Sequence, residues 1–245
     1  MSRNIMLTLR FDGSAYHGWQ LQKNAVTVQQ KVNEAINCVL HENINVNGCS
    51  RTDTGVHAMK FCCNFKTDKS IPCDKLPDAF NAYLPSDISV LHAEEKPMDF
   101  HSRFSCVGKE YIYKILNSKY RDPFYENRAL LYPYELNDLV LGEEISSFIG
   151  TYDFSAFCSS GSEVKDKIRT IRKAEIFREG ELVTVLFEGD GFLYNMVRIM
   201  VGTLLSINEG RIPVGAVSDI IESKDRNLSG CTSPARGLYL NNVFY

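Results

Sequence analysis

Residues 44–65 read INVNGCSRTDTGVHAMKFCCNF, in which two alternating segments are joined by an acidic turn. The segments INVNGC and VHAMKFCCNF both alternate apolar and polar residues in the manner of β-strands. Asp53 lies between them, with Arg51 two residues before it and Gly55 two residues after it. Because Asp-Thr-Gly is ordinary turn chemistry, Asp53 could be no more than a solvated turn residue. The other motifs of the chain decide between that interpretation and a functional one.

Strand and helix patterns alternate on both sides of this stretch. In the first half, residues 5–11 and 89–93 are typical of strands, and residues 74–84 are typical of a helix. Residues 27–41 predict a longer helix, because Thr27 can cap its first turn and apolar side chains recur on one face. The order strand, helix, two strands, helix, strand predicts one α/β unit.

The second half shows a similar alternation of elements. Strands are predicted at 109–116, 170–177, 182–187 and 237–240, and helices at 136–149, 192–207 and 213–222. We therefore expect two related α/β (α+β) domains, at 1–100 and 101–245. Each would be a mainly antiparallel mixed sheet with helices packed on one face.

The composition is that of a folded globular protein. The chain has 245 residues, of which 44% are hydrophobic and 23% charged, enough for one large domain or two small ones. The formal net charge of −3 disfavours a nonspecific polyanion binder, which is usually basic overall. A locally basic groove is still compatible with that charge. The N-terminal residues alternate like a strand and do not have the pattern of a signal peptide.

The eight cysteines do not form a metal-site pattern. No pair has Cys-x-x-Cys spacing, and the adjacent Cys62 and Cys63 should point to opposite faces of a strand. A zinc site near His57 is conceivable, but the paired spacings of structural zinc sites are missing. Free thiols buried in a protein of the reducing cytoplasm are the simpler interpretation, so no metal is expected.

The most apolar window, GFLYNMVRIMVGTLLSI at 191–207, carries Arg198 near its centre. It is too short and too charged for a membrane span, and its pattern predicts a buried helix. A buried arginine needs an anionic partner, unless its guanidinium reaches the surface. Asp53 is a candidate partner, and such a pair would hold the acid ionised and oriented. A nucleophile or general base requires that state.

Two further segments combine aromatic and cationic residues, namely FHSRFSCVGKEYIYKI at 100–115 and KDKIRTIRK at 165–173. Rings that stack on bases, beside cations that hold phosphates, are typical of proteins that bind single-stranded or flipped nucleotides. Core tyrosines with solvated lysines would give the same composition. The lone GDG at 189–191 lacks the full glycine pattern of a nucleotide fold, so no nucleotide cofactor is expected.

Asp-Thr-Gly also occurs at the active centre of aspartic proteases, where two facing carboxylates share one proton. This chain has one such triplet, whereas retroviral-type protease chains are far shorter and mostly β. The neighbouring Arg51 would also oppose a shared proton, so the protease interpretation is disfavoured.

Five motifs together resemble one family, tRNA pseudouridine synthase A. They are FDGSAYHGWQ at 11–20, GCSRTDTGVHA at 48–58, FHSRFSCVGKEYIYKI at 100–115, GDGFLYNMVRIMVGTLL at 189–205 and SPARGLYL at 233–240. They occur in the family's order and at suitable separations, and the resemblance runs from residue 4 to residue 245.

The resemblance implies an enzyme that isomerises uridine to pseudouridine at positions 38 to 40 of the tRNA anticodon stem-loop. It implies no cofactor and no metal, two α/β domains with a cleft between them, and a homodimer that grips tRNA across both subunits. Asp53 matches the single essential aspartate, and Arg51 matches an arginine that helps to extrude the target base. Tyr111 matches a tyrosine that stacks on the uracil. Arg198 matches the arginine that pairs with the aspartate, and Leu238 matches a residue that lines the pocket.

The residues leave three chemical routes open. An ionised Asp53 could attack the sugar C1′, attack the uracil C6, or abstract a sugar proton to give a glycal. Several positions also depart from the family's usual residues, namely Ser50, Ser102, Cys106, Lys109, Thr54 and Asn195. None removes a catalytic group, although they leave the target uridine open and are compatible with a divergent paralogue. A noncatalytic RNA-binding or tRNA-chaperone protein on the same scaffold is the main alternative.

Overall fold

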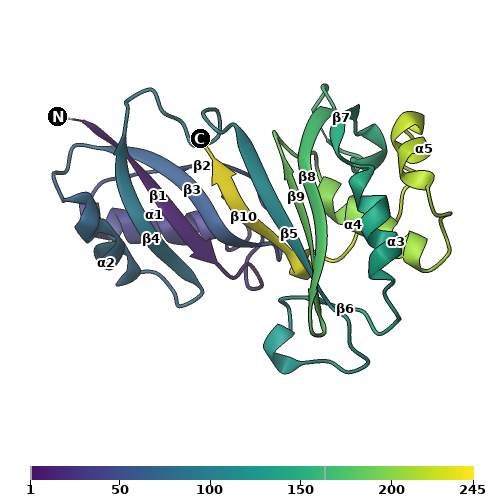
Figure 1. Cartoon of the computed structure of the whole chain (residues 1–245). Coiled ribbons are helices and arrows are strands. Elements are labelled where there is room, and N and C mark those ends of the chain that lie inside the picture. The colour runs from purple at the N-terminus through teal and green to yellow at the C-terminus, as the bar shows by residue number, and fades with distance from the viewer. Residues whose placement is uncertain (1, 163) are drawn as a thin grey trace. The chain divides into compact units, whose positions relative to one another are not determined.

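The computed structural model describes residues 2–162 and 164–245, which form two compact units (Figure 1). Unit 1 comprises Met1–Val107 together with Tyr239–Tyr245, and unit 2 comprises Gly108–Leu238. The sequence analysis instead placed all of residues 101–245 in the second domain. The difference at the C-terminus arises because the last strand pairs with a strand of unit 1, a long-range contact that local patterns do not reveal.

Unit 1 is built on a sheet with the strand order β4-β1-β3-β10, with β2 also paired to β3. Its strands are β1 (Arg3–Phe11), β2 (Asn47–Gly48), β3 (His57–Thr67), β4 (Ile88–Lys96) and β10 (Leu238–Phe244). The pairs of β1 with β3 and with β4 are antiparallel, whereas β10 runs parallel to β3. On β1 the alternate residues Ile5, Leu7 and Leu9 are fully buried, as the sequence alternation predicts.

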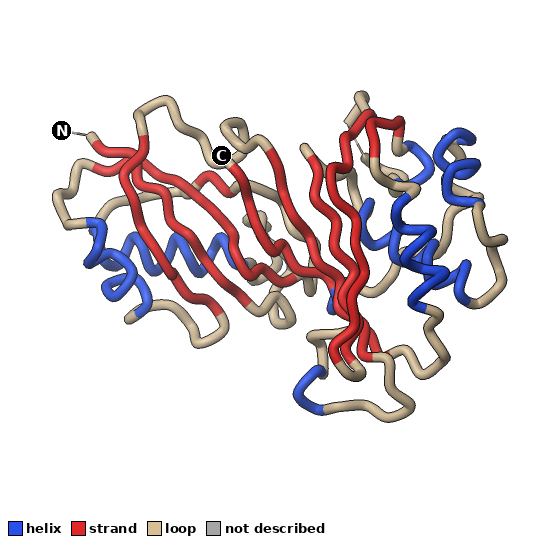
Figure 2. Tube along the Cα trace, viewed as in Figure 1, coloured by secondary structure: helices blue, strands red, loops and turns tan. Residues whose placement is uncertain are grey.

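The helices of unit 1 lie on one face of this sheet (Figure 2). They are α1 (Val28–Leu40) and α2 (Leu76–Asn81), the latter preceded by the 3-10 turn η1 (Cys73–Lys75). Thr27 caps α1, because its side chain accepts a hydrogen bond from the backbone N–H of Gln30. The helix predicted at 27–41 is therefore confirmed, whereas the one predicted at 74–84 is divided into a 3-10 turn and a shorter α-helix.

Unit 2 has a sheet with the strand order β5-β9-β8-β7, and β6 pairs in parallel with β5. Its strands are β5 (Gly108–Leu116), β6 (Leu130–Leu131), β7 (Gly150–Asp153), β8 (Ile168–Glu179) and β9 (Leu182–Gly189). The strands of the main path are all antiparallel to their neighbours. The hairpin predicted from the patterns at 170–177 and 182–187 is confirmed as β8 and β9. The short strands β6 and β7 were not predicted, because neither is long enough to show an alternating pattern.

The helices of unit 2 also gather on one side of its sheet (Figure 2). They are α3 (Asp138–Ser146), α4 (Met196–Asn208) and α5 (Ala216–Ser223), with the 3-10 turns η2 (Pro123–Tyr125), η3 (Ser155–Phe157) and η4 (Ala235–Gly237). Helix α4 begins at Met196, later than the predicted Phe192, because Asn195 has a left-handed backbone with φ of 60°. The core of this unit includes four fully buried rings that contact one another, those of Phe148, Phe154, Phe157 and Phe187.

These observations confirm the predicted fold class, an α/β protein with mainly antiparallel sheets and helices packed on them. All eight cysteines are free thiols, and Cys62 and Cys63 are both buried. Within residues 2–162 and 164–245, no helix has the length and hydropathy needed to cross a membrane.

Gly202 of α4 is where the chain after α5 crosses the helix most closely. A side chain at this position would collide with the backbone carbonyl of Cys231. The backbone N–H of Gly230 donates to Oγ1 of Thr203 at 2.8 Å, which fixes the crossing. Residues 230–233 therefore lie directly on α4 only because position 202 has no Cβ.

We expect Gly202→Ala to destabilise the protein by about 1–3 kcal/mol, because a rigid backbone carbonyl cannot move away from the new methyl group. Gly142→Ala is the matched control, since it lies within α3 and a Cβ there would meet only a side-chain methyl of Ile176 at 3.9 Å. That control should be neutral or stabilising by up to ~1 kcal/mol, the helix preference of alanine over glycine. Urea unfolding of both variants measures the difference, and equal stabilities would contradict the close crossing.

Candidate active site

Asp53 occupies the turn between β2 and β3 of unit 1, as the sequence predicts. The backbone N–H of Val56 donates to the carbonyl of Asp53 at 3.1 Å, which closes the turn, and Gly55 has a φ of 77°. Asp53 is half-buried, whereas Arg51 is exposed on the same turn. One turn thus presents an acid and a cation two residues apart, directly before the first residue of β3.

The loop that follows β1 holds this turn from both sides. The backbone N–H of Trp19 donates to the carbonyl of Thr52 at 3.1 Å. The backbone N–H of Gly55 donates to the carbonyl of Tyr16 at 3.3 Å. These two hydrogen bonds lie on either side of Asp53 in the sequence, so the motifs FDGSAYHGWQ and GCSRTDTGVHA form one structural element. We call this arrangement of residues 12–19 on residues 51–57 the turn clamp.

The clamp requires two residues without side chains. A Cβ at Gly13 would collide with the backbone carbonyl of Val56, and one at Gly18 would collide with the carbonyl of Thr52. Gly18 also has a φ of 81°, in the left-handed region that strains other residues. Because the nearest atoms belong to the backbone on both sides of Asp53, any side chain at Gly18 would displace the acid itself.

His57 fastens the other end of the turn. Its Nδ1 accepts a hydrogen bond from the backbone N–H of Gly13 at 3.1 Å. The ring is buried and stacks on Tyr239, with the two ring centroids 4.5 Å apart. This contact explains a residue of the motif that the sequence analysis weighed only as a metal ligand. Within the described residues there is no group of three or more side chains arranged to hold a metal ion.

Two aromatic side chains anchor the clamp loop in the core. Trp19 is 1% exposed and stacks on Phe61, with ring centroids 4.0 Å apart. The Tyr16 hydroxyl donates to Oδ1 of Asp87 at 2.5 Å. Burial, together with this carboxylate, raises the pKa of Tyr16 well above its ordinary value, so the hydroxyl stays protonated and the bond persists in alkaline solution. The loop is therefore held by buried groups at both of its aromatic positions.

Thr52, directly before Asp53, carries a buried hydroxyl that has no hydrogen-bond partner among the described residues. Leaving such a group unsatisfied costs about 1–3 kcal/mol. Unsatisfied buried polar groups are uncommon in native structures and often mark functional positions.

In unit 2, Tyr111 lies on β5 and is 7% exposed. Its ring packs edge-on against Phe192, with centroids 5.1 Å apart. Two residues along the same strand, the hydroxyl of the buried Tyr113 donates to the carbonyl of Pro234 at 2.7 Å. A Cβ at Gly237 would collide with the Tyr113 ring, so the SPARGLYL segment lies directly against β5.

Arg198 lies in the first turns of α4 and is held by the same segment. Its Nε donates to the carbonyl of Ser233 at 2.7 Å, and its Nη1 donates to Oδ1 of Asn195 at 2.7 Å. The backbone N–H of Ser233 donates in return to the carbonyl of Arg198 at 3.1 Å. Asn195 is itself oriented by a hydrogen bond to Ser159, at 2.9 Å. These contacts satisfy part of the hydrogen-bonding capacity of the guanidinium without an acid and fix its direction.

Leu238, the fifth residue singled out from the sequence, is the first residue of β10 and is 7% exposed. Residues 233–238 therefore connect Arg198, the strand that carries Tyr111, and Leu238 within unit 2. Unit 1 in turn places Arg51 and Asp53 on one turn. Each unit brings its own predicted residues together, and the sequence analysis missed the supporting residues Gly13, Gly18 and His57. Gly13 and Gly18 could have been found from the sequence, because both are glycines of the single motif FDGSAYHGWQ.

Comparison with known proteins identifies the family. The model of the tRNA pseudouridine synthase family matches residues 8–105 and 145–245. A tRNA pseudouridine synthase A of Clostridium acetobutylicum is 49% identical over 243 residues, which is 99% of this chain and the full length of the relative. One from a Thermoanaerobacter species is 46% identical over the same shares of the two chains. The chain belongs to the tRNA pseudouridine synthase family, whose members are isomerases.

A solved structure described as a Cbf5-Nop10-Gar1 complex is also similar, with a TM-score of 0.38 and 11% identity over 96% of this chain and 57% of that chain. A similarity at this level supports no argument, so the assignment rests on the sequence matches and the motifs.

The turn clamp predicts that Gly18→Ala lowers pseudouridine formation at least tenfold, because the new methyl group pushes on the backbone beside Asp53. A displacement of about 1 Å at a reacting group can cost on the order of 100-fold in rate. Gly210→Ala is the matched control: it has a similar φ of 70°, and nothing lies within 4 Å of its added Cβ. Both variants carry comparable backbone strain, so comparing their turnover at equal folded fraction isolates the displacement. Equal turnover of the two variants would show that the clamp does not position Asp53.

Proposed function

We propose that this protein isomerises uridine to pseudouridine at one or more of positions 38 to 40 of the tRNA anticodon stem-loop, with Asp53 as the catalytic carboxylate. The observation that carries the proposal is the turn clamp. In a family of uridine isomerases, two motifs far apart in sequence immobilise the backbone on both sides of one half-buried acid.

The reaction needs no external reactant. The bond from N1 of uracil to the sugar C1′ breaks, the ring turns while it is held, and C5 bonds to the same carbon. The proton on C5 is released in exchange for the one that N1 gains, so atoms and charge balance without a cofactor or a metal. Because the detached uracil must recombine with its own sugar, enclosure of the base contributes to the rate. Asp53 would act at C1′, at C6, or on a sugar proton.

The other four residues have separate proposed roles. The target base must leave its stack, which costs a few kcal/mol. Arg51 is exposed on the turn that carries Asp53, called here the catalytic turn, and would take part in extruding the base. Tyr111 would stack on the extruded uracil, and Leu238 would line the apolar side of the pocket. Arg198 would pair with Asp53 and keep it ionised, a role supported by the hydrogen bonds that orient its guanidinium.

We further propose that the enzyme works as a homodimer in the cytoplasm, as the resemblance to the family implies. The main rival is a noncatalytic RNA-binding or tRNA-chaperone protein on the same scaffold. Binding alone would require neither an immobilised acid on one unit nor an oriented arginine on the other, which favours the enzyme. The rival predicts binding without isomerisation, even when protein exceeds RNA.

The wild-type protein should convert uridine in an unmodified tRNA transcript, with pseudouridine mapped to positions 38 to 40 and tritium released from C5-labelled uridine. Asp53→Ala should lower the rate by on the order of 10⁴ or more, as the loss of catalytic nucleophiles does elsewhere. Affinity for tRNA should be largely retained. Asp68→Asn is the control, because this exposed acid lies beyond the opposite end of β3, roughly 35 Å of strand away. Retained pseudouridine formation by Asp53→Ala would remove Asp53 from the mechanism.

Arg198→Met should lower the single-turnover rate by about 100-fold, because the acid would lose its orientation and part of its charge stabilisation. Removing a cation raises the pKa of a neighbouring carboxyl, so the residual activity should need a higher pH than the wild type does. Arg211→Met, at an exposed position after α4, is the control. An unchanged acidic limb of the pH–rate profile would show that Arg198 does not act on Asp53.

A further inference from the structure

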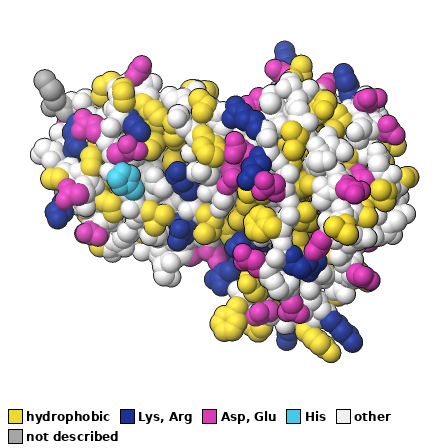
Figure 3. Space-filling model, viewed as in Figure 1, with side chains coloured by type: hydrophobic (Ala, Val, Ile, Leu, Met, Phe, Trp, Pro, Cys, Tyr) yellow, Lys and Arg dark blue, Asp and Glu magenta, His cyan; other side chains and the backbone are white. Residues whose placement is uncertain are grey.

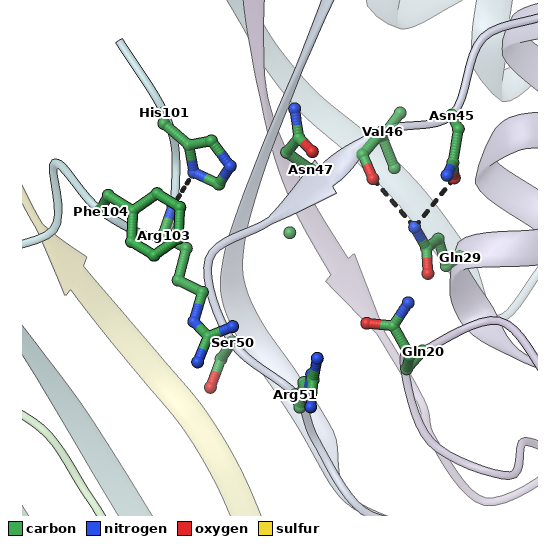
Figure 4. Close-up of a pocket in the computed structure, with 11 residues that line it drawn as sticks. Gln20, Gln29, Asn45, Val46, Asn47, Ser50, Arg51, His101, Arg103 and Phe104 are labelled. Carbon is green, nitrogen blue, oxygen red and sulfur yellow. Dashed lines mark hydrogen bonds between the residues drawn. The ribbon is translucent and has the colours of Figure 1, made fainter. Parts of the chain in front are cut away.

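Unit 1 contains a polar pocket beside the catalytic turn, with a volume of about 200 Å³ (Figure 4). The pocket is far larger than the ~10–15 Å³ that one water molecule needs. Arg103 and Ser50 lie on one side of it in the close-up, and Gln20 and Gln29 lie on the other. Further polar residues of the lining are Asn47, Arg51 and His101.

The lining of the pocket favours an anion. Arg51 and Arg103 contribute guanidinium groups, and no Asp or Glu lines the pocket within the described part of the chain. His101 accepts a hydrogen bond at Nδ1 from the backbone N–H of Arg103, at 3.1 Å. Because Nδ1 accepts, the ring hydrogen lies on Nε2, which makes Nε2 a donor. Amide groups of Gln20 and Asn47 add further donors around the space.

One wall of the pocket is aromatic and open to solvent. The ring of Phe104 is 77% exposed, although phenylalanine is among the residue types most often buried. The His101 ring lies 4.4 Å from it, and the Arg103 guanidinium lies over it at 5.7 Å from the centroid. An exposed ring with a guanidinium and an imidazole as neighbours offers a surface on which a nucleobase can stack.

The opposite wall is organised before any ligand arrives. Oδ1 of Asn45 accepts hydrogen bonds from Nε2 of Gln29 at 3.1 Å and from Nδ2 of Asn33 at 2.9 Å. Gln29 is buried in α1 and also donates to the carbonyl of Val46 at 2.9 Å. Because these side chains are fixed by one another, a ligand in the pocket would lose little affinity in ordering them.

We propose that this pocket binds the RNA strand next to the target uridine, holding one phosphodiester between Arg51 and Arg103 and stacking an adjacent unpaired base on Phe104. The inference rests on the proposed function, because it names a second part of the same substrate. Arg51 and Asp53 are two residues apart, so their Cα atoms are at most ~7 Å apart. The phosphate beside Arg51 would therefore belong to a nucleotide close in the strand to the one at Asp53.

The overall charge explains why such a pocket is needed. The chain has a formal net charge of −3, and on the face drawn in Figure 3 Lys and Arg side chains are interspersed with Asp and Glu. Long-range attraction therefore contributes little to binding of a polyanion. Arg51 and Arg103, with no acid in the described lining of the pocket, would supply the attraction locally and fix the strand in register.

The test measures binding of a 17-nucleotide anticodon stem-loop to the full-length protein at several salt concentrations, with a single-turnover assay on the same samples. Arg103→Gln should raise the Kd about tenfold and reduce the slope of log affinity against log salt by ~0.7, the value for one contact to single-stranded phosphate. Phe104→Ala should raise the Kd about 5- to 100-fold, as the loss of a base stack does. The controls are Lys75→Gln and Tyr83→Ala, an exposed cation and an exposed ring elsewhere in unit 1.

Modified RNAs identify the contacts. An uncharged methylphosphonate at one linkage beside the target should weaken the wild type about tenfold and weaken Arg103→Gln, which keeps only the Arg51 contact, by a clearly smaller factor. An abasic nucleotide beside the target should likewise weaken the wild type but not Phe104→Ala. The inference is overturned if both variants behave like the controls, or if no loop position shows this coupling. It is also overturned if uridine monophosphate occupies the pocket without any coupling to the RNA strand, which would identify a mononucleotide site.

The two proposals fail separately. A wild-type protein that shows the coupling but forms no pseudouridine would contradict the proposed function and support the pocket. A wild type that forms pseudouridine while Arg103→Gln and Phe104→Ala retain its affinity and salt slope would support the function and reject the pocket.

Discussion

The backbone hydrogen bonds between the loop after β1 and the turn before β3 are the constraint on which the functional reading of unit 1 depends. A two-residue strand such as β2 cannot by itself fix the direction of an acid in the turn that follows it. The clamp does so through backbone groups of Thr52 and Gly55, and it works only because Gly18 has no side chain. The single tryptophan and Tyr16 then tie the loop into the core.

Unit 2 achieves the same end with side-chain donors and a crossing segment. Residues 233–238 accept from Arg198 on one side and from Tyr113 on the other, so a helix and a strand are joined through backbone carbonyls. Gly202 permits the preceding residues to lie against α4. In the sequence, Arg198 is an isolated charge in an apolar helix. In the structure its guanidinium is oriented by hydrogen bonds to Ser233 and Asn195, neither of which is an acid.

The clamped turn and the neighbouring pocket of unit 1 would have different roles toward RNA. The clamped turn presents one acid at a fixed position, as bond rearrangement requires. The neighbouring pocket presents two guanidinium groups and an exposed ring, which are the features that let a protein bind a strand with little sequence preference. Arg51 belongs to both, which would couple extrusion of the target base to capture of the adjacent phosphate. This division of labour would let the departure at Ser50, which lines the pocket, adjust the choice of uridine without touching the acid.

The sequence by itself determined the fold class, most helices and strands, and the five candidate residues, because periodicity, caps and dense motifs are local and survive without coordinates. It missed β6 and β7, started α4 too early, and did not reveal that β10 pairs with β3. Only the tertiary structure decided that Gly13, Gly18 and His57 support the turn, and that Gln20 and Asn47 share a pocket with Arg103. Those groupings depend on contacts between residues about 30 to 80 positions apart in the chain. Closing such long loops costs entropy, which burial offsets only once the sheet has formed, so no local pattern in the sequence predicts these contacts.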